Sequence, residues 1–104
     1  MASERRLIGS PFQRGVDDTR PYRIDVSVWG AGTYASPGAV VLDETGEDVT
    51  AEVLSGSASF SGSYLTTPDF VADGMTAEQR YKMIVSWTVN GKTVSAFGQI
   101  EAQQ

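Results

Sequence analysis

The chain contains no cysteine and no histidine among its 104 residues. The absence of cysteine excludes a disulfide framework, a thiolate zinc site and a cysteine nucleophile within the chain. The absence of histidine removes the commonest general base and the commonest transition-metal ligand. We therefore expect a protein that is not an enzyme and that has no catalytic residues, no metal site and no cofactor.

Long apolar runs are also missing. No stretch approaches the ~20 apolar residues that a membrane-spanning helix needs, so we expect no membrane contact. Near the N-terminus only Leu7 and Ile8 are apolar in succession, and Gly9 and Pro11 follow them closely. This pattern lacks the apolar core of a signal peptide and predicts synthesis in a cytoplasm.

The residues that are present are typical of a small β domain. The chain has eleven glycines, 40% hydrophobic residues and 20% charged residues, which suits one domain with a modest core. Abundant glycine favours turns and strands over long helices. The composition therefore predicts a single small soluble domain without indicating what it does.

Charge is distributed unevenly along the chain. Residues 1–23 contain five arginines and three acidic side chains, whereas residues 24–104 contain three basic and ten acidic side chains. We predict an extended basic N-terminal arm over residues 1–21 and an acidic domain over residues 22–104. The net charge of −5 argues against specific nucleic-acid binding, because phosphate contacts need lysine and arginine.

Two interpretations of the arm are open. It is either a flexible, solvated terminus or a segment that docks on a partner. Its apolar side chains would be unusual in a free tail, so we favour docking, with apolar anchors and with arginines that meet an acidic surface. The predicted partner-binding residues of the arm are Arg5, Arg6, Leu7, Ile8, Phe12 and Arg14.

The clearest local pattern lies near the C-terminus. Apolar residues alternate with polar or smaller ones over residues 81–89, Asn90-Gly91 follows, and the chain returns over residues 92–102. An Asn-Gly pair between alternating runs predicts a hairpin with a type I′ turn. The predicted register pairs Val89 with Lys92, Thr88 with Thr93, Trp87 with Val94, Val85 with Ala96, Met83 with Gly98 and Tyr81 with Ile100.

This register separates two faces of the hairpin. The outer face is polar except that Ile84 lies opposite Phe97, and we include both among the candidate partner-binding residues. They are either an ordinary cross-strand pair or are covered, by this chain's own arm or by another chain. The predicted inner face consists of Tyr81, Met83, Val85, Trp87, Val94, Ala96 and Ile100.

Upstream of the hairpin the pattern predicts shorter elements. Apolar and polar residues alternate from Tyr22 to Trp29, which predicts a half-buried strand over residues 22–29. The other expected elements are a loop over 30–38, a strand over 39–42, an acidic turn over 43–48, a short strand over 49–54, a strand over 57–67 with a bend at Gly62, and a connector over 68–79 with one helical turn at 76–79.

Together these elements predict an all-β fold. Short strands separated by turn signals roughly every 8–12 residues are typical of an immunoglobulin-like antiparallel β-sandwich, here with the extended N-terminal arm added. The Cys–Trp–Cys pattern of immunoglobulin domains is absent, so the prediction concerns the architecture alone.

The polar clusters do not indicate catalysis. The alternating serines between Ser55 and Ser63 have neither a histidine nor a Ser-x-x-Lys motif to activate them. The four acidic residues between Asp43 and Asp48 lie on one turn, whereas glycoside hydrolysis needs two carboxyls across a groove. They also lack the alternating pattern of an EF-hand loop. We interpret this cluster as a solvated acidic turn.

Several short motifs carry a resemblance to a known family. They are Tyr22-Arg23-Ile24-Asp25, Gly46-Glu47-Asp48-Val49, Val53-Leu54-Ser55-Gly56-Ser57-Ala58-Ser59, Gly74, Gln79-Arg80-Tyr81 and Gly98-Gln99-Ile100-Glu101. With these motifs, roughly four-fifths of the chain resembles small tailed-bacteriophage virion proteins with an immunoglobulin-like fold, the fiber-tail adaptor or neck-associated proteins. That family has no catalytic residues to carry over.

The resemblance implies a structural role in a virion. We expect an adaptor or connector at the neck or tail, present in multiple copies in a symmetric assembly, that docks on neck, tail, portal or capsid proteins. A capsid decoration protein is the first alternative. The second alternative is a host-surface or carbohydrate-binding module, for which the only feature is Trp29 and Tyr34 on a glycine-rich loop.

Overall fold

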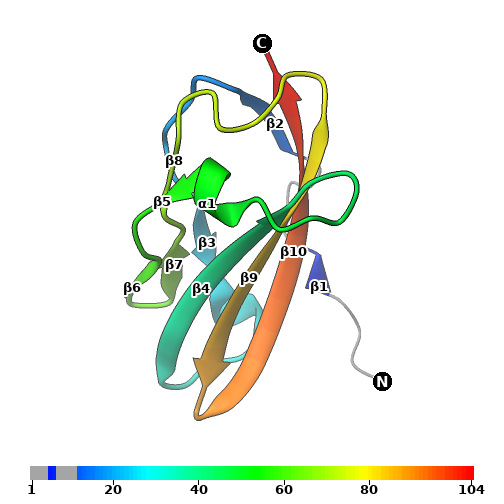
Figure 1. The fold of residues 1–104 in the computed structure, drawn as a ribbon. Helices are drawn as coiled ribbons and strands as arrows, with labels where there is room; N and C mark the ends of the chain where they lie inside the picture. Colours follow the sequence, from blue (N-terminus) through cyan, green and yellow to red (C-terminus); the bar gives the residue numbers. More distant parts are fainter. Residues whose placement is uncertain (1–4, 7–11) are drawn as a thin grey trace.

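The computed structural model describes residues 5–6 and 12–104 (Figure 1). The described chain is mostly β-strand and forms several sheets, which is consistent with the predicted all-β sandwich. The elements are β1 Arg5–Arg6, β2 Phe12–Gly15, β3 Arg23–Asp25, the 3₁₀ helix η1 Val26–Trp29, β4 Tyr34–Leu42, α1 Thr50–Val53, β5 Leu54–Ser55, β6 Ser59–Ser61, β7 Tyr64–Thr66, β8 Asp69–Phe70, β9 Arg80–Val89 and β10 Lys92–Gln103.

The main sheet is built around the predicted hairpin of β9 and β10, which are antiparallel. Each predicted pair is present, from Lys92 opposite Val89 to Ile100 opposite Tyr81, so the register is confirmed. Asn90 and Gly91 have φ angles of 50° and 81°, as a type I′ turn requires. The order β1-β10-β9-β4, with β2 also paired to β10, gives this sheet five strands.

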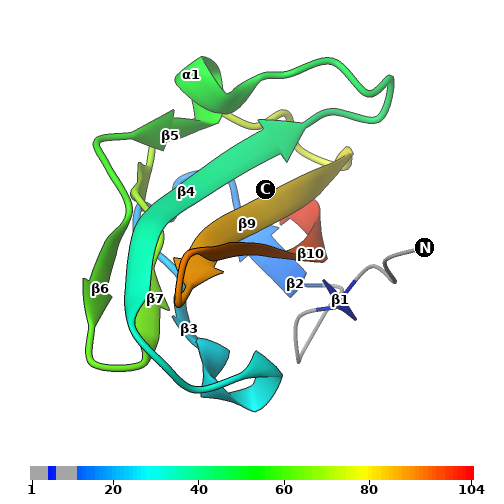
Figure 2. The same cartoon turned by 90° about the horizontal axis from the view of Figure 1, so that it is seen from below.

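A second layer consists of two smaller sheets. Strands β3, β7 and β6 form one of them in that order, and β5 pairs with β8 in the other. Figure 2 shows β3, β6 and β7 to one side of the β4–β9–β10 layer. The core between the layers includes Val26, Leu65 and Phe70 from the second layer and Met83, Val85, Trp87 and Ile100 from the hairpin. The predicted inner face of the hairpin is therefore confirmed as the core face, with Val94 only partly buried.

The strand predicted over residues 22–29 ends early, at Asp25. The Asp25 carboxylate accepts hydrogen bonds from the Ser27 amide at 3.0 Å and the Ser27 hydroxyl at 2.6 Å, which caps the N-terminus of η1. The backbone therefore turns into a 3₁₀ helix although the side chains still alternate. As a result Val26 is fully buried, whereas Val28 is 57% exposed.

Two further strand predictions are wrong in the middle of the chain. Residues 50–53 form the short helix α1 instead of a strand over 49–54, because the Asp48 carboxylate accepts from the Thr50 amide and hydroxyl at 2.9 and 2.6 Å. The single strand expected over 57–67 is a hairpin of β6 and β7. Gly62, at φ 60°, turns the chain between them.

The glycine-rich segment and the connector also differ from expectation. Strand β4 begins at Tyr34, inside the predicted loop over 30–38, and accommodates Ser36 and Pro37 through a register shift between Ala35 and Gly38. The helical turn predicted at 76–79 is a non-helical turn, because Glu78 has a φ of 70°.

The predicted arm over residues 1–21 does not stand apart from the domain where the structure describes it. Strand β2 pairs in parallel with Ile100–Gln103 of β10, and β1 pairs in parallel with Ala96–Phe97. From Phe12 to Gly15 the segment is therefore a strand of the main sheet. Leu7 and Ile8 lie outside the described residues.

Candidate protein-docking surface

An apolar row crosses the outer face of the main sheet. The register places Val40 of β4 beside Ile84 of β9, and Ile84 beside Phe97 of β10. Successive strand residues point to opposite faces, and the neighbouring residues Val41, Met83 and Val85 are buried in the core, so the row faces away from it. Val40 is 38% exposed, and Ile84 and Phe97 are half-buried.

The surroundings of this row are polar. The Lys82 ammonium lies 4.8 Å from the centre of the Phe97 ring, a distance at which a cation is attracted to the ring face. Toward the hairpin turn the same face carries small hydroxyl side chains, namely Ser86, Thr88, Thr93 and Ser95. The result is a flat sheet face with a narrow apolar stripe between polar borders, as in many protein interfaces.

The described part of the N-terminal segment does not cover this row. Strand β2 extends the sheet sideways from β10, and the Phe12 ring packs 4.9 Å from the Tyr22 ring, against the core side. Of the two covers expected for Ile84 and Phe97, the chain's own residues 12–21 are therefore excluded.

Arg14 corrects one of the predicted partner contacts. The residue is only 6% exposed, with its guanidinium carbon 3.8 Å from the centre of the Phe70 ring and 4.9 Å from that of Tyr22. It donates hydrogen bonds to the carbonyl oxygens of Asp18, at 3.0 Å, and of Arg20. Arg14 thus stabilises the attachment of β2 and is not available to an acidic surface on a partner.

Of the other predicted arm residues, the structure describes the strand that Arg5 and Arg6 form and the surroundings of Phe12. Arg5 and Arg6 form β1, where Arg6 pairs with Phe97 through the backbone, at the edge of the apolar row. Phe12 is half-buried and packs on this chain's own Tyr22.

A separate cleft opens between β2, β3 and η1. Its volume is about 310 Å³, and its lining residues are Phe12, Tyr22, Arg23, Ile24, Asp25, Val28 and Trp29. The Trp29 ring lies 5.7 Å from the buried Trp87 ring, so only part of Trp29 faces the cleft. Tyr34 stacks on Phe60 at 5.4 Å and donates to the Gly30 carbonyl. The two aromatic residues considered for sugar binding therefore do not share one platform.

The acidic turn is held together by its own hydrogen bonds. The Asp43 carboxylate accepts from the Thr45 hydroxyl at 2.6 Å and from the Glu47 amide at 3.0 Å. The Thr45 hydroxyl bond is the main reason that the pKa of Asp43 lies below its ordinary value, and the Thr50 hydroxyl lowers the pKa of Asp48 in the same way. These carboxylates are therefore local caps in turns.

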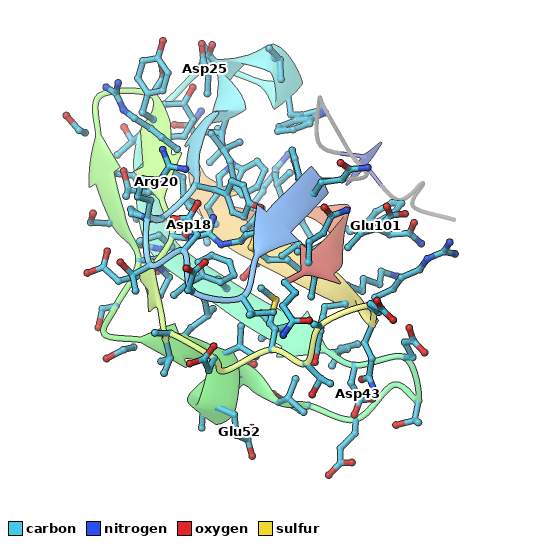
Figure 3. The ribbon with its side chains drawn as sticks, turned by 90° about the horizontal axis from the view of Figure 1, so that it is seen from above. Asp18, Arg20, Asp25, Asp43, Glu52 and Glu101 are labelled. Carbon is cyan, nitrogen blue, oxygen red and sulfur yellow. The ribbon has the colours of Figure 1, made fainter. Side chains whose placement is uncertain are left out.

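Asp18 is the most strongly perturbed carboxyl in the described chain. Arg20 donates to it from its guanidinium, at 2.7 and 3.0 Å, and from its amide (Figure 3). These bonds hold the pKa of Asp18 far below its usual range. The Asp18–Arg20 pair holds the loop whose carbonyl oxygens accept hydrogen bonds from Arg14. Its role is therefore to stabilise the fold.

Within residues 5–6 and 12–104, no group of three or more acidic side chains is placed to hold a metal ion. In the same part of the chain no helix has the length and apolar character to cross a membrane. No protein-family model and no curated protein matches the chain. The sheet face and the cleft between β2, β3 and η1 are the two surfaces with exposed apolar side chains described above.

Several residues of these surfaces were not identified as candidates from the sequence, among them Val40 and Val28. Val40 lies in the predicted strand over 39–42, but its place beside Ile84 depends on which strand β4 joins. The sequence pattern predicts Val28 in a half-buried strand. Its side chain is exposed because residues 26–29 form the 3₁₀ helix η1 instead. The sequence signal that could have found it is Asp25 two residues before Ser27, a capping arrangement.

Proposed function

We propose that this chain is a non-enzymatic structural protein that docks on neighbouring proteins through the outer face of its main sheet. The observation that carries the proposal is the apolar row of Val40, Ile84 and Phe97 on three adjacent long strands. A rigid sheet positions these side chains before binding, which lowers the entropy lost on association. The polar borders of the row suit a specific contact between soluble proteins.

The strand order supports the finer assignment of an immunoglobulin-like sandwich. In that fold one sheet contains strands C, F and G, and the other contains B, E and D. Here β4, β9 and β10 correspond in order to C, F and G, and β3, β7 and β6 correspond to B, E and D. Strand β2 then lies at the outer edge of G, where its parallel pairing places it.

A local feature at the start of β9 supports the same assignment. The Tyr81 hydroxyl oxygen accepts a hydrogen bond from the Thr76 amide at 2.7 Å. Immunoglobulin-like sandwiches carry such a tyrosine near the start of strand F, bonded to backbone a few residues upstream. Met83 occupies the position two residues later, where immunoglobulin domains have the second cysteine.

For the biological setting we propose a phage virion, with the chain as an adaptor at the neck or tail. The support for this setting is the resemblance of the short motifs named above to virion adaptor proteins. A symmetric particle presents the same neighbour to every copy, so one docking face per subunit suffices. A capsid decoration protein would use the same fold and face, and differs in the number of copies.

Copy number in purified particles tests this setting. Quantitative mass spectrometry against the major capsid protein is expected to give on the order of a dozen copies, as in a ring at the portal or tail. Hundreds of copies would favour shell decoration instead. Absence of the chain from particles would contradict both virion roles.

Variants of the apolar row test the docking face itself. The double substitution Ile84→Ser with Phe97→Ser is expected to lower incorporation into particles at least about tenfold, because the interface loses its apolar centre. The matched pair Val40→Ser and Val71→Ser sharpens the test, since both valines are 38% exposed but only Val40 lies in the row. Equal incorporation of all variants, with unchanged thermal midpoints, would contradict the docking face.

A further inference from the structure

The cleft between β2, β3 and η1 is a second surface with features of a binding site. Its volume of about 310 Å³ falls at the lower end of the range for ligand pockets, roughly 300–1,000 Å³. That space suits one or two side chains better than a large cofactor. It lies beside the short strand β3, whereas the apolar row lies on the outer face of the main sheet, so the two surfaces are separate.

The cleft exposes apolar surface that the fold could have buried. Val28 is 57% exposed, more than any other large hydrophobic residue in the described part of the chain. It stands beside Trp29, whose ring is fixed against the buried Trp87. Phe12 and Tyr22, a packed aromatic pair, also line the cleft, which gives it preformed apolar surface.

Within the described part of the chain, no strand pairs with β3 on the side away from β7. Strand β3 is the last strand of its sheet and pairs on one side with β7. Tyr22 accepts from the Thr67 amide and Val26 donates to the Ser63 carbonyl, each at 2.9 Å. Antiparallel ladders alternate in direction, so the amide and carbonyl of Arg23 point away from β7. An extended segment could therefore pair with this edge by β-augmentation.

Arg23 is one of the cleft-lining residues, and its positively charged group is directed toward β7. The Arg23 guanidinium lies 4.0 Å from the centre of the Tyr64 ring, which orients it. Among the ion pairs of the described residues none involves Arg23. Asp25, which lies at the start of η1 (Figure 3), is instead engaged by the amide and hydroxyl of Ser27 and by the Ser63 hydroxyl. The unpaired cation therefore favours an anionic group on the bound molecule.

From these observations we propose that the cleft binds an extended peptide segment of a partner protein. The segment pairs with the edge of β3, inserts an aromatic or branched apolar side chain against Val28 and Trp29, and places a carboxylate near Arg23. The lining is mainly apolar, which suits such a side chain better than a sugar with many hydroxyl groups.

Tryptophan fluorescence of the full chain provides the test. The probe is the blocked peptide acetyl-Ser-Phe-Glu-Ser-amide, which contains no tryptophan. We expect a saturable emission change at about millimolar peptide, as for a short segment with one anchor. The change should disappear in Trp29→Phe, because Trp87 is buried in the core. No saturable change up to about 10 mM peptide would overturn the proposal.

Two control comparisons identify the contacts. Val28→Ser should weaken peptide binding about fivefold through lost apolar contact, whereas Val40→Ser, on the outer sheet face, should leave it unchanged. Replacing glutamate by glutamine in the peptide should weaken binding about threefold to the unaltered chain and not at all to Arg23→Gln. Equal effects of Val28→Ser and Val40→Ser would contradict the site.

Two other outcomes would assign the cleft to a different occupant. If sedimentation shows that the full chain self-associates and Val28→Ser abolishes it, the occupant is a second copy. If a simple pyranoside changes the Trp29 emission and the peptide does not, the cleft is a sugar site. Near-ultraviolet circular dichroism confirms that each variant is folded, and neither outcome affects the proposal for the apolar row.

Discussion

The β9–β10 hairpin and the segment from Phe12 to Arg20 are attached to the same core by different kinds of contact. The hairpin has ten consecutive antiparallel pairs and buries the large Trp87 side chain. The N-terminal segment has a short parallel pairing of β2 with β10 and one buried arginine between two aromatic rings.

This difference shows which contacts stabilise each of the two regions. In the hairpin, the stabilising contacts are repeated along two strands that are joined by a tight turn, so they form together. In the N-terminal segment, the contacts join residues that are far apart in the chain. Several of them meet at Arg14, which connects β2 with the Asp18–Arg20 loop and with Phe70. The hairpin therefore depends mainly on apolar burial, whereas the attachment of β2 depends in large part on the polar side chain of Arg14.

The largest expected effect concerns the hairpin core. Trp87→Ala should lower the free energy of unfolding by about 3–5 kcal/mol, because it leaves a large cavity. The Trp87 indole nitrogen is buried without a hydrogen-bond partner among the described residues, so the contribution is apolar. Val28→Ala, at an exposed position, should change the same quantity by less than about 0.5 kcal/mol. Urea unfolding measures both, and similar losses would contradict the comparison.

The next largest effect concerns the N-terminal segment and its buried Arg14. Arg14→Met should cost about 2–4 kcal/mol, because it removes two charged hydrogen bonds and the cation–π contacts. Arg80→Met is the control, since Arg80 is exposed and lies 3.7 Å from Glu101, and should cost less than about 0.5 kcal/mol.

Hydrogen exchange shows where Arg14→Met acts. The Val16 amide, which donates to the Gln103 carbonyl at 2.7 Å, should exchange faster in the variant, while amides at the centre of the hairpin keep most of their protection. Uniform loss of protection throughout the molecule would mean that β2 and the hairpin unfold as one unit.

A smaller effect is expected at the hairpin turn. Gly91→Ala should cost about 1–2 kcal/mol, because the φ of 81° strains a residue with a Cβ. No atom lies within 4 Å of the added Cβ, so the loss comes from the backbone alone. Gly91→Asn, which tolerates this conformation better, should lose less than half as much in thermal unfolding. Equal losses for alanine and asparagine would point to another cause.

The smallest effect concerns acid stability of the N-terminal loop. The native pKa of Asp18 is lowered by its hydrogen bonds from Arg20, below the unfolded value of about 3.9. Its stabilising contribution is therefore complete above about pH 4 and declines as the pH falls toward the native pKa. Asp18→Asn should flatten the fall in thermal midpoint between about pH 5 and pH 2, by less than about 3 °C. Arg20→Gln should act in the same way, and an unchanged slope in both would contradict the assignment.

The candidate docking face was partly predictable from the sequence. The Asn90-Gly91 turn determines the register, and the register places Ile84 opposite Phe97 on the outer face. The third member, Val40, could not be placed, because period-two alternation does not say which strand lies beside β9. The role of Arg14 was also missed, since its partners Tyr22 and Phe70 meet it only in the folded chain.

The sequence by itself determined the β character, the hairpin with its register and the apolar inner face. These features depend on neighbours in the chain, through turn geometry and side-chain alternation. Only the tertiary structure decided that residues 12–15 join the main sheet, that Arg14 is buried and that Val28 is exposed. The physical reason is that parallel strand pairing, and the packing of Arg14 against aromatic rings, bring together residues that are far apart in the sequence. No local sequence pattern specifies such partners.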